Sequence, residues 1–137
     1  MTHSLFNLHI TIKIETNKPI EFISDILDAE PTDFVRMGEA KFDFLDKAEQ
    51  NIWILTEIHT DLNEIGNHIQ DFIKSNSIFC KKINELNKIG KCVLRLSVVS
   101  DYAQIGFCLS QEDLQLLSQL NIPFEISIFS WGNCVDE

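Results

Sequence analysis

Residues 6–15 read FNLHITIKIE, a strict alternation of apolar and polar side chains. Successive side chains on a β-strand point to opposite faces, so this stretch predicts a long strand with one buried side. Its polar side indicates a sheet that is open to solvent, or to a partner, on one face. A helix should follow from Pro19 to about Asp28, because proline suits the first helical position and apolar residues then recur at helical spacing.

The rest of the chain alternates apolar runs with helical patterns. Residues 29–40 are expected to form an irregular connection, because Pro31 and Gly38 interrupt them. Ser110 followed by Asp113 resembles the capping box that opens a helix. The expected strands are 42–44, 51–60, 91–100, 105–109 and 124–128, and the expected later helices are about 61–73, 79–89 and 111–120.

This order of elements, β-α-β-β-α-(α)-β-β-α-β, interleaves strands with helices, yet several strand pairs have connections as short as a hairpin. It predicts an α+β fold, with a mixed or mostly antiparallel sheet and helices packed on one face. The order also admits two halves related by pseudo-symmetry, as in ferredoxin-like folds.

The length of 137 residues suits one domain. We therefore expect a single α+β domain over residues 1–137, with its core at about 5–131. No basic and then apolar leader opens the chain, and no stretch approaches the roughly 18 apolar residues that cross a bilayer. A cytoplasmic protein is expected. In that compartment cysteines stay reduced, so we expect free and mostly buried thiols at Cys80, Cys92, Cys108 and Cys134.

Charge is distributed unevenly around a formal total of −10. Residues 21–49 hold nine acids and three bases, residues 74–95 hold six bases and one acid, and residues 96–137 hold six acids and no Lys or Arg. Two such acidic stretches repel nucleic acid and anionic membranes and attract a cationic surface. The alternative is that the acids only solvate the surface and aid solubility.

Catalytic and metal-binding motifs are missing from the sequence. No HExxH, GxSxG or glycine-rich phosphate loop occurs, and no two cysteines form a CxxC pair. His9 and His59 both fall on expected strands, so a hydrolase with a site near these two histidines is one alternative. We otherwise expect no enzyme, no metal and no cofactor.

Several short motifs occur in an order that resembles a known family. They are Glu30-Pro31-Thr32, Arg36-Met37-Gly38, the strand around Trp53, Leu109-Ser110, Asn121-Ile122-Pro123 and the strand Phe124–Phe129. Together they resemble the bacterial domain-of-unknown-function family 4279 over about residues 5–131. Arg36-Met37-Gly38 departs from the Trp-Arg/Lys-Gly expected there, which leaves the role of this loop open. The family has no established reaction, and by analogy similar small acidic bacterial proteins serve as immunity proteins.

The expected function is therefore that of an immunity protein, which binds and neutralises a toxin domain. A basic nuclease would attract an acidic blocker to its substrate groove. A cognate toxin domain is the expected partner, nucleic acid and membranes are not, and a homodimer stays open. The alternative is a small ligand-binding or oligomerising domain. The residues expected to contact the partner are Asp33, Glu39, Asp43, Asp46, Glu49, Asp101 and Trp131.

Overall fold

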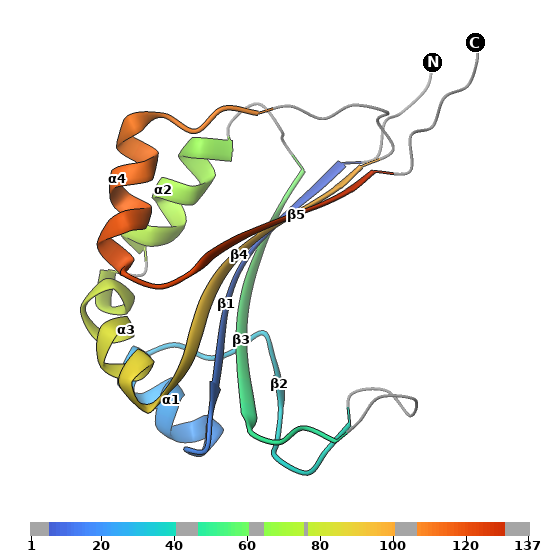
Figure 1. Cartoon of the computed structure of the whole chain (residues 1–137), viewed down its shortest axis with the longest axis vertical. Helices are drawn as coiled ribbons and strands as arrows, with labels where there is room; N and C mark the ends of the chain where they lie inside the picture. Colours follow the sequence, from blue (N-terminus) through green and yellow to red (C-terminus); the bar gives the residue numbers. More distant parts are fainter. Residues whose placement is uncertain (1–5, 41–46, 61–64, 76, 101–106, 131–137) are drawn as a thin grey trace.

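The computed structural model describes residues 6–40, 47–60, 65–75, 77–100 and 107–130. Its helices α1–α4 lie on one side of a five-stranded sheet, and no helix within these ranges covers the other face (Figure 1). Within the described ranges, no helix is long and apolar enough to cross a membrane. Along the chain the elements are β1 (Phe6–Thr16), α1 (Ile20–Leu27), β2 (Asp33–Val35), β3 (Asn51–His59), α2 (Ile65–Ser75), α3 (Ser77–Ile89), β4 (Gly90–Ser100), α4 (Gln111–Leu120) and β5 (Phe124–Ser130).

The strand order across the sheet is β2-β3-β1-β4-β5. β1 runs antiparallel to both of its neighbours, β3 and β4, and β2 runs antiparallel to β3. This arrangement of β1 to β4, with helices between β1 and β2 and between β3 and β4, is that of a ferredoxin-like fold. α4 then leads to β5, which lies parallel to β4 and extends the sheet by one strand. The expected α+β class, mixed sheet and one-sided helix layer are confirmed.

The alternation in β1 decides which face of the sheet is buried. Leu8, Ile10, Ile12 and Ile14 are at most 2% exposed and lie under the helices, while the polar residues between them are half-buried on the open face. The helices contribute the other half of the core, with their buried side chains at Ile20, Ile23, Leu27, Ile65, Ile69, Phe72, Ile73, Ile83, Leu86, Leu117 and Leu120.

α1 begins and ends close to where the sequence predicts. Pro19 precedes its first residue, and Asp28 ends it in the left-handed conformation with φ 52°. The backbone N–H of Asp28 donates to the Ser24 carbonyl, which closes the last turn.

The expected capping box of α4 is also confirmed. The Asp113 backbone N–H donates to Ser110 Oγ at 3.1 Å, and the Ser110 backbone N–H donates to Asp113 Oδ2 at 2.8 Å. The other carboxylate oxygen of Asp113 accepts a hydrogen bond from the Gln70 amide on α2. One buried acid therefore begins α4 and joins it to α2.

Two expectations about strands need correction. The connection 29–40 is not wholly irregular, because it contains β2. That strand has three residues, too few to show an alternation, and it follows a proline. The expected strand 105–109 is wrong for residues 107–109, which are not in a strand. Phe107 and Leu109 pack against the core from a loop, so their apolar pattern reflects burial alone. Residues 105–106 and the expected strand 42–44 lie outside the described residues.

Candidate functional site

A tight turn follows β2 at residues 36–39. The Glu39 backbone N–H donates to the Arg36 carbonyl at 2.9 Å, and Gly38, the third residue, has φ 90°. A positive φ at that position is the mark of a type II turn and favours glycine. The Glu39 carboxylate accepts from the Arg36 backbone N–H at 2.9 Å, which closes the turn a second time. The loop whose role was left open is thus held in one conformation.

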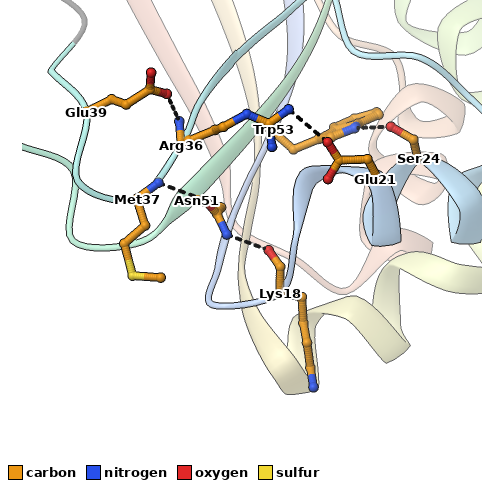
Figure 2. A network of polar contacts seen from close by, with 8 residues as sticks. All are labelled: Lys18, Glu21, Ser24, Arg36, Met37, Glu39, Asn51 and Trp53. Carbon is orange, nitrogen blue, oxygen red and sulfur yellow. Dashed lines mark hydrogen bonds and ion pairs between the residues drawn. The ribbon is translucent and has the colours of Figure 1, made fainter.

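Asn51, the first residue of β3, holds this turn against the start of α1 (Figure 2). Its side-chain oxygen accepts from the Met37 backbone N–H at 2.7 Å, and its side-chain nitrogen donates to the Lys18 carbonyl at 2.8 Å. One amide therefore joins two loops that are far apart in the sequence.

Trp53 fixes α1 to the sheet close by. Its side chain is fully buried, and its indole N–H donates to Ser24 Oγ at 3.0 Å. Trp53 therefore belongs to the core. Figure 2 shows this contact beside the pair formed by Arg36 and Glu21.

Arg36 extends from the turn towards α1. One guanidinium nitrogen lies 2.8 Å from Glu21 Oε1, and the guanidinium carbon lies 5.0 Å from the centre of the Phe34 ring. The hydrogen bond from Arg36 is the main reason why the pKa of Glu21 lies below its ordinary value. The same contact raises the pKa of Arg36, so both groups are charged at neutral pH.

A hollow of about 300 Å³ lies between α1 and β2, and Arg36 forms part of its wall. The acids in its lining are Glu21, Asp25 and Glu30, and Arg36 is the single base there. Three carboxylates against one guanidinium give the lining a formal charge of −2 at neutral pH. Pro31 and Phe34 add apolar surface, and Phe34 is exposed. This site can accept a cationic or mixed cationic and apolar group.

Sequence reasoning found only part of this site. The charge count marked residues 21–49 as acidic, and Glu21, Asp25 and Glu30 all fall within that stretch. The approach of the first two to Glu30 and Arg36 depends on β2 pairing with β3, which the sequence pattern did not reveal.

The predicted partner-binding acids are placed as follows. Glu39 is exposed at the turn, and its backbone carbonyl accepts from the Ala48 backbone N–H at 2.7 Å, so it lies near the exposed Glu49. Asp33 is half-buried at the other end of β2, and its carboxylate accepts from the Phe34 backbone N–H. The other predicted residues lie outside the described residues: Asp43, Asp46, Asp101 and Trp131.

The two strand histidines do not converge. His59 pairs with Leu8 on the helix side of the sheet, so His9, the next residue along β1, points to the open face. His59 instead stacks on His68 of α2, with ring centres 3.8 Å apart, and its Nε2 lies 2.7 Å from the Glu57 carboxylate. Among the described residues, no group of three His, Cys, Asp or Glu is arranged to hold a metal ion.

A family model described as Domain of unknown function (DUF4279) matches residues 4–131. No curated protein matches the chain significantly, and no solved structure does.

Proposed function

The chain belongs to the DUF4279 family, and we propose that it is a protein-binding inhibitor of the immunity type, which neutralises a basic toxin domain. The observation that carries the proposal is the set of carboxylates around the hollow between α1 and β2. Acids from a helix and from the following loop gather there, and Arg36, the base in the lining, is already paired with Glu21.

Rigidity supports a role in binding. The turn at 36–39 is closed by its own hydrogen bonds and is attached to the body of the protein through Asn51, so its charged groups are held in place before a partner arrives. Groups that are already ordered lose less conformational entropy on association.

The charge at this surface has the sign that a basic partner requires. Glu39 and Glu49 do not line the hollow, but both are exposed, and Glu39 accepts from the backbone N–H of Arg36, whose side chain is in the lining. A nuclease groove that binds phosphates carries Lys and Arg, so an acidic surface would be steered to it and would compete with nucleic acid. A lysine or arginine side chain of the toxin would enter the hollow beside Asp25 and Glu30.

The test is a binding and rescue experiment with the product of the gene directly upstream. Co-expression should restore growth of cells that make the toxin domain, and the two purified proteins should form a complex. The double variant D25K/E30K should slow association and lose rescue, because it reverses two charges in the hollow. Asp71→Lys, an exposed acid on α2, is the matched control and should leave both unchanged.

Salt dependence separates electrostatic steering from other modes of binding. The association rate of the wild-type protein should fall steeply as ionic strength rises, and that of D25K/E30K should depend on it less. Equal rates for the wild type and D25K/E30K at low salt would refute the role given to the hollow. The absence of any complex with the upstream product would refute the immunity role itself.

A further inference from the structure

We propose that the outer edge of β5 pairs with β5 of a second copy of this chain, antiparallel and about a two-fold axis at Ser127, which joins two five-stranded sheets into one. This proposal is independent of the proposed inhibitor function. β5 is the last strand of the sheet, and no strand of the described part of the chain flanks its outer side. The opposite edge is β2, which has only three residues against seven in β5.

The backbone of β5 presents a complete set of outward hydrogen-bonding groups. The Leu94 backbone N–H donates to the Pro123 carbonyl, and Leu94 then pairs with Phe124 in the parallel ladder. In such a ladder alternate residues bond to the neighbouring strand, so the odd-numbered residues of β5 point their amides and carbonyls to β4. The amides and carbonyls of residues 124, 126, 128 and 130 therefore face outwards.

A two-fold axis at Ser127 uses all four of these residues. It places residue 124 opposite residue 130 of the partner subunit, and Ile126 opposite the partner's Ile128. Each of these is a pair that exchanges two backbone hydrogen bonds in an antiparallel ladder. Moving the axis by one residue in either direction would leave some of the four residues without a partner on the second strand. The axis at Ser127 therefore gives the most backbone hydrogen bonds.

The side chains suit the same register. Ile126 and Ile128 are on the helix side of the sheet and are 48% and 50% exposed. Pairing would place Ile126 against the partner's Ile128 twice, which buries apolar surface that the helices leave uncovered. On the open face Glu125 would lie opposite the partner's Phe129, so no two like charges meet. The interface is therefore self-complementary, as a two-fold dimer requires.

The strand also lacks the features that protect sheet edges. Proteins block exposed edges with lysine, proline or inward charges. β5 has no lysine and no proline, and its one charge, Glu125, is bound by Arg95 on β4 at 2.8 Å. A single strand pair buries less area than a standard interface, so the dimer should form in a concentration-dependent way.

The first experiment is sedimentation velocity on the whole chain over a range of concentrations. The wild-type protein should shift from monomer to dimer as concentration rises, and Ile128→Lys should remain a monomer. Ile58→Lys is the matched control, because Ile58 is also an exposed isoleucine, at 59%, but lies on β3 and not on β5. A wild-type protein that is monomeric throughout overturns the proposal, and so does an Ile128→Lys protein that dimerises like the wild type.

Cross-linking tests the register. At the proposed axis the two copies of residue 127 form a non-hydrogen-bonded pair with Cα atoms about 4.5 Å apart, within reach of a disulfide. Ser127→Cys should give a covalent dimer on mild oxidation. Ser97→Cys, the paired residue on β4, should give no more covalent dimer than the wild-type protein. Equal cross-linking of the two variants would overturn the register. Circular dichroism on each variant establishes that it is folded.

Discussion

The carboxylate of Asp113 on α4 occupies the space in which a Cβ at Gly66 on α2 would lie. The same carboxylate caps α4 and accepts the amide of Gln70, one helical turn beyond Gly66. The contact between α2 and α4 is therefore polar and close, and it requires glycine at one specific position.

Gly66→Ala should destabilise the protein by about 1–3 kcal/mol, because the added methyl group displaces the buried carboxylate from its partners. Urea denaturation measures the change. Asn67→Ala, at the exposed neighbouring position, should have little effect. Equal stability of the two variants would show that α2 and α4 can separate without cost.

Asp113 should make stability depend on acid pH. Hydrogen bonds hold the pKa of this carboxyl below its ordinary value of 3.8, and the one from Gln70 has the largest effect. The unfolded chain therefore binds the proton more tightly, so the contribution of Asp113 is complete above pH 3.8 and is lost as the pH falls through the lower folded pKa. Asp113→Asn should flatten this acid limb in unfolding measured against pH. If Asp113→Asn loses stability at acid pH as the wild type does, other carboxyls cause that loss.

Asn51 should control the order of the turn at 36–39. Asn51→Ala removes both side-chain contacts and should cost about 1–2 kcal/mol. Asn51→Asp retains an acceptor for the Met37 amide but loses the donor to the Lys18 carbonyl. Hydrogen exchange at the Met37 amide should accelerate in Asn51→Ala and stay slow in Asn51→Asp. Fast exchange in both variants would mean that the aspartate does not replace the amide.

The pair of Glu21 and Arg36 should be visible by titration. Arg36→Gln should raise the pKa of Glu21 towards its ordinary value of 4.5, because the largest cause of its lowering is removed. Side-chain carboxyl chemical shifts in NMR follow this directly. Arg95→Gln removes a guanidinium that binds a different acid, Glu125, and should leave the titration of Glu21 unchanged.

The described cysteines should differ in reactivity. Burial raises the pKa of Cys92 to about 12, so it carries almost no thiolate at neutral pH. Cys108 is exposed, so it is an exception to the expectation that the thiols are mostly buried. Alkylation followed by mass spectrometry should label Cys108 in the native protein and Cys92 only after unfolding. Labelling of Cys92 in the native state would show that the sheet opens.

Sequence reasoning predicted the elements whose pattern is local. The alternation in β1 and the cap of α4 are carried by neighbouring residues, and both are confirmed. Pro19 marked the start of α1 to within one residue, because it precedes the first helical residue and does not occupy that position. β2 was missed because three residues are too few to show an alternation. It is held by pairing with Trp53 and its neighbours on β3, which are distant in the sequence.

The candidate site was less predictable for the same reason. Charge counts pointed to residues 21–49, yet the hollow depends on Arg36 reaching across to Glu21, which no spacing rule encodes. Of the predicted contact residues, Glu39 and Glu49 lie near each other, whereas Asp33 lies apart at the other end of β2.

The position of β1 at the centre of the sheet also fixes when the protein can fold. Among the strands of this sheet β1 is synthesised first, but one neighbour, β3, ends at His59, and the other, β4, ends at Ser100, which pairs with Phe6. Pairings so distant along the chain form slowly, because a long loop must close before any contact compensates for it. The apolar side of β1 therefore stays exposed until β4 has been synthesised. This interval is when the nascent protein is most prone to aggregate and most in need of a chaperone.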